Sequence, residues 1–450
     1  MKKNTYIIAL CAFILSTFNL VKAEAQRVTK TSSKVEQLVN SDTERLQDIF
    51  KDIHANPELG FMEFRTADIV AKELQKLGYK TITGIAGTGV VGILENGKGP
   101  IVMYRADMDA NSIKEITGLP YASTKIVKKD DGTETPVMHG CGHDAHTTWL
   151  LGAAKVMVEM KNSWKGTLVF VAQPAEELIL GAEAMAKEMY TKGVPQPDYL
   201  FGMHTAPLPL GYIAAAEGMR TAGTDQIDVT FKGIGGHGSR PHLAKDPIIM
   251  ATTAVVEYQS IISRVIDPQK AAVLTVGSIQ AGSDNNVIPE SALVKINLRW
   301  FDVKDREIMI EGIKRVNDGI AYAYDLPKEL YPEIVMKGWA YPLNNNPELT
   351  AIVVKGLESI APADKILKED VVPTVLGSED FHHLVIHNEK KDYCYINVGI
   401  ANPEKFEAAK KEGKQFPFAP HTGSYQVDLD AIPYGTKIAA VGLLQIFNAK

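Results

Sequence analysis

The stretch PVMHGCGHDAH, at residues 136–146, holds the densest chemistry in the chain. It contains Cys141 and the imidazoles of His139, His143 and His146, although the 450-residue chain has only 11 histidines and 3 cysteines. Glycines flank Cys141 on both sides, so its thiolate and the His143 imidazole can face one ion without bulky side chains between them. Sulfur and nitrogen donors favour a transition metal over magnesium or calcium. The stretch therefore predicts a metal site.

Two adjacent glutamates, Glu176 and Glu177, follow the apolar run 167–172. In extended backbone, neighbouring side chains point in opposite directions, so one carboxylate can ligate a metal while the other faces a substrate. A divalent ion lowers the pKa of a bound water and polarises a carbonyl, while a free carboxylate passes the proton to a leaving nitrogen. The pattern predicts amide hydrolysis; a solvated helix start is the simpler alternative for such a pair.

Strands and helices that must position these side chains alternate along the chain. The predicted strands are 89–94, 101–105, 167–172 and 199–203, and the predicted helices are 43–56, 63–77, 145–160 and 182–190. This alternation predicts an α/β domain with a mixed, mostly parallel sheet. Ligands bind at the carboxyl ends of such strands. Asp107, Asp109, the glutamate pair and His204 each follow a predicted strand, so we expect them to converge there.

The pattern changes between residues 221 and 337. Predicted strands at 226–232, 272–276, 291–300 and 329–336 enclose predicted helices at 247–265 and 304–322. This order suits a split βαβ, ferredoxin-like α+β unit inserted into the first domain. We therefore expect a catalytic domain built from residues 26–220 and 338–450, with 221–337 as an inserted domain. The polar segment 125–136 predicts a solvated hairpin.

Residues 1–25 have the features of an export signal. Lys2 and Lys3 precede an apolar run at 7–20, and Ala-Glu-Ala at 23–25 matches a signal-peptidase site. The run is short for a membrane span. We expect cleavage after residue 25, a periplasmic or secreted protein, and no stable membrane association afterwards. An uncleaved anchor is the alternative.

Composition excludes some partners. The formal net charge of −6 comes without a basic block, which argues against nucleic acid as a partner. The glycine-rich run 233–238 lacks the Lys-Ser/Thr pair of a phosphate-binding loop and contains His237 instead. A small-molecule substrate is the remaining expectation.

A series of motifs then resembles a known family. In chain order they are HANPELGFMEF, RADMDA, HGCGHDAHT, QPAEE, GMH, GIGGHGSRPH, NVIPESA, GSEDF and HTGSY, between about residues 42 and 446. Together they resemble the metal-dependent aminoacylase/carboxypeptidase amidohydrolases, in the branch of the hippurate hydrolases and the indole-acetyl-amino-acid (auxin-conjugate) hydrolases. The resemblance implies hydrolysis of N-acyl amino acids with two divalent ions per subunit, Zn²⁺ or Mn²⁺. An exported dipeptidase or metallo-carboxypeptidase is the alternative, and a non-catalytic carboxylate-binding protein is a rival of another class.

The resemblance also implies residue roles. Five residues resemble the ligands of the two-metal centre: Cys141, His143, Glu177, His204 and His421. Glu176 resembles the general base, and Asp109 resembles a carboxylate that orients a ligand or catalytic group. His237 resembles the histidine that steadies the oxyanion, in some relatives from the neighbouring subunit. Asn286 and Arg299 resemble residues that hold the substrate carboxylate.

The inserted domain is expected, by the same resemblance, to act as a lid and to form a homodimer. Asn111 follows RADMDA where relatives usually have leucine, which puts the shape of that loop in question. We expect His146, at the start of a helix, to orient the site, with His139 as a weaker candidate for that role. His382 and His383 should be split between the rim and the surface.

Overall fold

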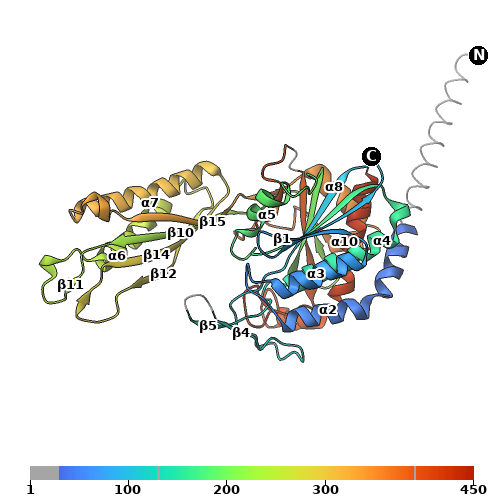
Figure 1. Cartoon of the computed structure of the whole chain (residues 1–450), viewed down its shortest axis with the longest axis horizontal. Helices are drawn as coiled ribbons and strands as arrows, with labels where there is room; N and C mark the ends of the chain where they lie inside the picture. The colour runs from blue at the N-terminus through green and yellow to red at the C-terminus, as the bar shows by residue number, and fades with distance from the viewer. Residues whose placement is uncertain (1–29, 129–131, 390–391, 450) are drawn as a thin grey trace, which may run out of the picture.

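The computed structural model describes residues 30–128, 132–389 and 392–449, which form two lobes joined by extended segments (Figure 1). The predicted export signal lies outside these ranges. Within them, no helix combines the length and the apolar character needed to cross a membrane.

An eight-stranded sheet forms the centre of the main lobe, in the order β1-β2-β6-β3-β7-β18-β8-β17. β3 pairs parallel with β6 and β7, and β18 with β7, so the centre of the sheet is parallel and its β1-β2-β6 side antiparallel. This confirms the predicted mixed, mostly parallel sheet. The strands are β1 (Lys80–Ile85), β2 (Gly89–Asn96), β3 (Ile101–Asp107), β6 (Gly166–Gln173), β7 (Tyr199–Pro209), β8 (Ile213–Ala214), β17 (Ile366–Leu367) and β18 (Tyr393–Ala401).

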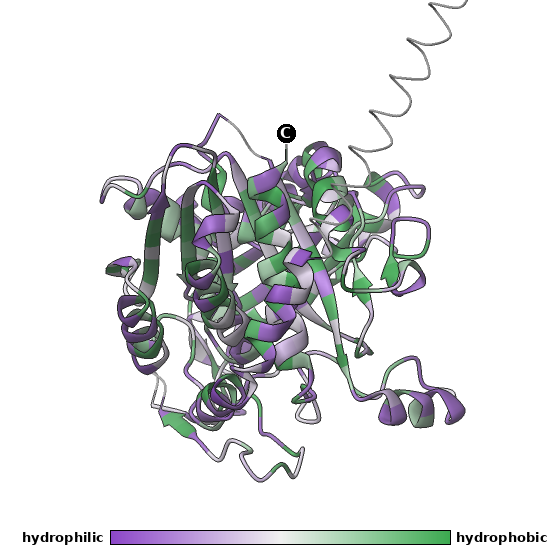
Figure 2. Cartoon of the chain, turned by 90° about the vertical axis from the view of Figure 1, so that its right-hand side faces the viewer, coloured by the Kyte–Doolittle hydropathy of each residue, from purple (hydrophilic) through white to green (hydrophobic). Residues whose placement is uncertain are grey.

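Helices cover both faces of this sheet because each sheet face is apolar. One core joins the sheet to α2, α4, α8 and α10, and a second core joins the other face to α5 and η6. In Figure 2 the strands of this lobe are largely hydrophobic, while the helices beside them also carry hydrophilic residues. The helices are α2 (Thr43–Ala55), α3 (Phe64–Lys76), α4 (His143–Glu159), α5 (Gly181–Met189), η6 (Phe381–Val385), α8 (Pro347–Leu357), α9 (Pro403–Lys411) and α10 (Ala431–Asn448).

The second lobe has its own sheet, in the order β12-β14-β10-β15, with every pairing antiparallel. Its core packs the sheet against α6 and α7. The chain order β10-α6-β12-β14-α7-β15 is that of a split βαβ unit. The elements are β10 (Gly223–Lys232), β11 (Gly236–His237), α6 (Pro247–Ser260), β12 (Val273–Ala281), β13 (Val287–Ile288), β14 (Ser291–Trp300), α7 (Val303–Ala323) and β15 (Glu333–Ala340).

β15 (Glu333–Ala340) lies further along the chain than the predicted strand. The predicted strand 329–336 begins too early, because η4 (Lys328–Leu330) and Pro332 precede β15. It also ends too early, since β15 pairs with β10 as far as Ala340. The chain then returns through β16 (Leu343–Asn345), which pairs with β9 (Gly218–Thr221).

The predicted hairpin at 125–136 is confirmed. β4 (Ile126–Lys128) and β5 (Glu134–Pro136) pair antiparallel and lie apart from both cores, below the main lobe in Figure 1. Since β5 ends at Pro136, the hairpin leads directly into the cysteine- and histidine-rich stretch 136–146.

Candidate metal centre

Three segments carry the candidate ligands to one edge of the main sheet. Asp109 follows β3, the glutamate pair follows β6, and His143 opens α4. His204 differs from its prediction: it lies inside β7, which does not end at Met203. The strand continues because His204 and the residues after it pair with β18 from Asn397 onward.

A tight turn presents Cys141 and His143 together. Between them Gly142 has a φ of 85°, in the left-handed region. A Cβ at this position would lie 2.5 Å from the Oγ1 atom of Thr205, so only glycine fits without displacing β7. Thr205 in turn donates a hydrogen bond from Oγ1 to the Cys141 carbonyl at 2.7 Å. The turn is thereby fixed to the neighbouring strand.

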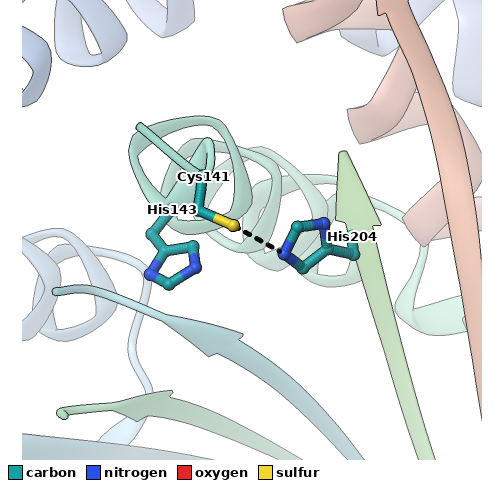
Figure 3. Close-up of side chains that lie close together, drawn as sticks. All are labelled: Cys141, His143 and His204. Atoms are coloured by element: carbon teal, nitrogen blue, oxygen red, sulfur yellow. Dashed lines mark hydrogen bonds between the residues drawn. The ribbon is translucent and has the colours of Figure 1, made fainter. Parts of the chain in front are cut away.

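Cys141, His143 and His204 form one group of donors. The thiol of Cys141 points at the His204 ring, with 3.4 Å between Sγ and Nε2, and His143 lies beside it on the same turn (Figure 3). One donor atom from each of the three lies within 4.8 Å of the others. Sulfur and nitrogen ligands of one tetrahedral zinc ion lie about 3.6 Å apart. The spacing therefore suits two ligands of the same ion.

Cys141 also belongs to a second group, with Glu177 and His421. The Nε2 atom of His421 lies 3.3 Å from Oε1 of Glu177. Because the thiol is common to both groups, Cys141 could help to hold an ion in either group. The structure thus brings all five residues predicted as ligands together.

The polar atoms of this cluster fit a cation. Nε2 of His143 and Oε1 of Glu177 are buried and have no hydrogen-bond partner within the described ranges. Such orphaned atoms are costly unless an ion or water satisfies them. Burial opposes ionisation of the Cys141 thiol, but the His204 charge lowers its pKa to about 5. Burial likewise opposes charge on Glu177, but the neighbouring His421 imidazole lowers that pKa to about 2.

Asp109 ties two of these ligands together. Its Oδ1 atom lies 3.2 Å from Nδ1 of His143, and its Oδ2 accepts a hydrogen bond from the Glu177 N–H at 2.9 Å. The contact to Nδ1 leaves Nε2 of His143 free to face an ion. This is the geometry expected of a carboxylate that orients ligands. Asn111 accepts a hydrogen bond from the Gly140 N–H at 3.1 Å and so supports the same turn.

Glu176 and Glu177 are not arranged as predicted. They lie in a turn rather than in extended backbone, because Ala175 before them has a φ of 52°. Each carboxylate comes to 3.9 Å from Nε2 of His143, so both face the cluster. Glu176 is only 6% exposed. Burial and the negative charge of Glu379 raise the pKa of Glu176 well above its usual range.

The other histidines of the stretch have different surroundings. His146 contacts Asp107 through Nδ1 at 2.6 Å and accepts the N–H of Thr205 at Nε2 at 2.8 Å, so both of its ring nitrogens are engaged within the protein. This suits the expected orienting role better than ligation. His139 is buried, and neither ring nitrogen has a hydrogen-bond partner in the described part of the chain.

Sequence reasoning missed a buried ionic network beside Glu176. Arg105 is fully buried in β3 and pairs with Asp107 at 2.8 Å, Glu379 at 2.8 Å and Asp380 at 3.2 Å. One signal was present: an arginine and an aspartate inside the apolar run IVMYRAD need buried partners.

The prediction for His382 and His383 is wrong. Neither reaches the surface, with 6% and 1% of their area exposed. His382 packs on Tyr393, and His383 packs on Trp339 of β15. His383 therefore lies at the junction between the lobes, whereas His382 packs within the main lobe.

The three candidate site residues of the second lobe lie at two different places. His237 is exposed on β11, at the end of that lobe away from the main lobe (Figure 1), and its Nδ1 atom is hydrogen-bonded to Ser239. Asn286 is exposed beside it, with its carbonyl bound by the Gly238 N–H at 2.7 Å. The metal cluster of the same chain therefore lacks both residues. Arg299 instead reaches the main lobe, where it donates to Oγ of Ser378.

An α/β sheet that gathers thiolate, imidazole and carboxylate donors at the carboxyl ends of its strands is typical of a metal-dependent hydrolase. Comparison with known proteins agrees. Residues 103–414 match the model of peptidase family M20/M25/M40, and the chain belongs to this family.

Two relatives support the branch indicated by the sequence motifs. The hippurate hydrolase of Campylobacter jejuni is 41% identical over 286 residues, which cover 63% of this chain and 71% of the relative. An IAA-amino acid hydrolase of Arabidopsis thaliana, ILR1-like 2, is 33% identical over 409 residues, covering 89% and 85%. The resemblance to these amidohydrolases is confirmed, and the chain is a hydrolase.

A solved structure shares the fold. The crystal structure of a Bacillus subtilis protein, described as a dinuclear metal-binding peptidase of the M20 family, is 25% identical and superposes with a TM-score of 0.67. It covers 91% of this chain and all of its own.

Proposed function

We propose that this enzyme hydrolyses the amide bond of N-acyl amino acids with two divalent ions, Zn²⁺ or Mn²⁺, in each subunit. The ligands are the five residues of the two donor groups that have Cys141 in common: Cys141, His143, Glu177, His204 and His421. The observation that carries the proposal is the position of Cys141, whose sulfur belongs to both donor groups. The names of the two relatives, a hippurate hydrolase and an IAA-amino acid hydrolase, support the substrate class.

Bound ions supply Lewis-acid activation of water and of the scissile carbonyl. Glu176 acts as the general base: it takes the proton from the attacking water and delivers it to the leaving nitrogen. Its burial favours the protonated form that must exist between these two transfers. Asp109 keeps His143 and the glutamate turn in place through its two contacts.

Recognition of the substrate involves the second lobe. Arg299 binds the free carboxylate of the amino acid, since its guanidinium reaches the main lobe and lies within electrostatic range of Glu176. His237 and Asn286 complete the site of a partner subunit in a homodimer, with His237 steadying the oxyanion and Asn286 contacting the carboxylate. Their exposure at the end of the second lobe supports this division.

The protein acts on a small molecule in the periplasm or outside the cell, after removal of residues 1–25. Residues 26–220 and 338–450 form the catalytic domain, and residues 221–337 form the lid and dimerisation domain, except that the last strand of the lid sheet, β15, extends to Ala340. The separate core of the second lobe supports this division.

The test is a substrate panel with metal analysis. Purified protein is loaded with Zn²⁺ or Mn²⁺ and assayed on N-acyl amino acids, dipeptides and carboxypeptidase substrates. We expect fastest turnover of an N-acyl amino acid and loss of activity with a chelator. Faster cleavage of peptides would instead favour the dipeptidase or metallo-carboxypeptidase alternative. Binding without turnover of any substrate would favour a non-catalytic carboxylate-binding protein, and hydrolysis unaffected by the chelator would contradict the mechanism.

A further inference from the structure

Arg299 crosses from the second lobe to the main lobe and is held at two points. Its Nε donates to Oδ1 of Asn297 at 2.8 Å, and its Nη1 donates to Oγ of Ser378. Both acceptors are neutral. No ion pair joins Arg299 to a carboxylate among the residues that the structure describes. A half-buried guanidinium is therefore held in place without its charge being neutralised by a direct partner.

The support on the second lobe lies within its sheet. Asn297 sits two residues before Arg299 on β14, so their side chains share one face of the strand. The Nδ2 atom of Asn297 donates to Oγ1 of Thr224 at 3.2 Å. Thr224 is fully buried and pairs with Arg299 across the β10–β14 ladder. The amide is thus fixed with its oxygen toward the guanidinium.

The support on the main lobe is equally fixed. Ser378 directly precedes Glu379 and Asp380, whose carboxylates pair with the fully buried Arg105 at 2.8 and 3.2 Å. The segment that carries the Ser378 hydroxyl is therefore anchored to the centre of the main sheet through β3.

We infer that Asn297 and Ser378 are positioning residues that hold Arg299 with its remaining N–H groups free for the carboxylate of the substrate. The inference rests on the proposed function. A guanidinium has five N–H donors, and these two contacts use one on Nε and one on Nη1. The remaining three are one donor on Nη1 and two on Nη2, so one N–H from each of these nitrogens is available for a two-point contact with a carboxylate. The arrangement selects substrates with a free carboxylate over their amides.

The experiment compares hippurate with its amide, N-benzoylglycinamide, on the metal-loaded enzyme. Asn297→Leu removes the acceptor for Nε but keeps the size of the side chain. We expect the KM for hippurate to rise about 10-fold, the loss expected when a charge-assisted hydrogen bond is removed. The kcat for hippurate and the KM for the amide should stay within about twofold, as for an interaction made equally in ground and transition states.

Controls separate positioning from folding. Gln226→Leu removes an amide directly opposite Asn297 in the ladder, and it should leave both KM values unchanged. Ser378→Ala should raise the KM for hippurate, and Ser378→Thr, which keeps the hydroxyl, should restore it. In an Arg299→Ala background, Asn297→Leu should add nothing, because both changes act through one guanidinium.

Three kinetic results would overturn the inference: an equal rise in KM for hippurate and its amide, an additive effect with Arg299→Ala, or an unchanged KM for hippurate. Calorimetric affinity for hippurate is measured on the same variants, so the outcome does not depend on turnover; an affinity that Asn297→Leu leaves unchanged also overturns it. Absence of turnover of every N-acyl amino acid by the wild type is a different result, which contradicts the proposed function itself.

Discussion

The cluster around Cys141 and the loop around His237 differ in how completely one chain builds them. Cys141 and His143 are buried, held by a required glycine, and surrounded by further donors and their supports. His237 is exposed, and within the described part of the chain its ring is hydrogen-bonded to Ser239 alone. The first region is preorganised within one subunit, whereas in the second an imidazole that could act in a site is exposed to solvent and far from the other residues of the site.

This difference separates two kinds of function. Ligands must be held close together despite their mutual repulsion, which requires a rigid and buried frame. A group that stabilises charge only during the reaction can be supplied when a partner docks. The predictions below test whether the two regions belong to one active site.

The largest effect is expected from Glu176→Gln. General-base catalysis contributes roughly 10²- to 10⁴-fold to the rate, so kcat should fall by a factor near the upper end of that range. Metal content should stay at the wild-type level, because glutamine replaces only the proton acceptor. Glu183→Gln, on the nearby helix α5, is the control and should keep full activity. Retained turnover in Glu176→Gln would remove this residue from the mechanism.

His237→Ala tests the separation of the two regions. We expect kcat to fall by about 10²-fold, as for loss of one oxyanion donor. Mixed dimers of His237→Ala with Glu176→Gln should then regain activity, because one of their two sites has both wild-type residues. With random pairing, about a quarter of all sites are restored. A lack of recovery in mixed dimers, or a monomer by size-exclusion chromatography, would place His237 outside the active site.

A smaller effect concerns the pH dependence of stability, which we expect to come from a histidine in the main lobe and not from one in the second lobe. Burial opposes charge on His54, but hydrogen bonds with Asp144 and Glu115 raise its pKa to about 9. The resulting stabilisation is complete below pH 6.5 and is lost as the pH rises through 9. It amounts to roughly 3 kcal/mol. The free energy of unfolding of the metal-loaded enzyme should fall over this range.

His54→Gln should flatten that pH dependence, whereas His242→Gln, at an exposed site in the second lobe, should leave it unchanged. Equal slopes in the wild type and His54→Gln would show that the charge on His54 does not stabilise the fold.

Much of the main lobe could be predicted from sequence because its signals are local. Apolar runs and helical periodicity identified the strands that precede Asp109 and Glu176, and the helix after the Cys141 turn, although α4 begins two residues earlier than predicted, at His143. Parallel strands then place their carboxyl ends at one edge. The density of donors around Cys141 marked the centre of the site. These features depend on neighbours along the chain.

The errors arose where contacts distant in sequence decide the structure. The turn at Glu176 depends on the left-handed Ala175, whose N–H is held by Glu63. The extent of β7 depends on pairing with β18. His383 is buried because Trp339 of the other lobe covers it. No local pattern carries this information.

The central claim is that the Cys141 thiolate is a ligand of a two-metal centre, and metal analysis with X-ray absorption tests it most directly. We expect two ions per chain, with sulfur among their ligands. In Cys141→Ala the sulfur signal and at least 10²-fold of the activity should be lost. Cys394→Ala, which changes the core thiol in β18, should alter neither property. Two ions without a sulfur ligand in the wild type, or full activity in Cys141→Ala, would contradict the account.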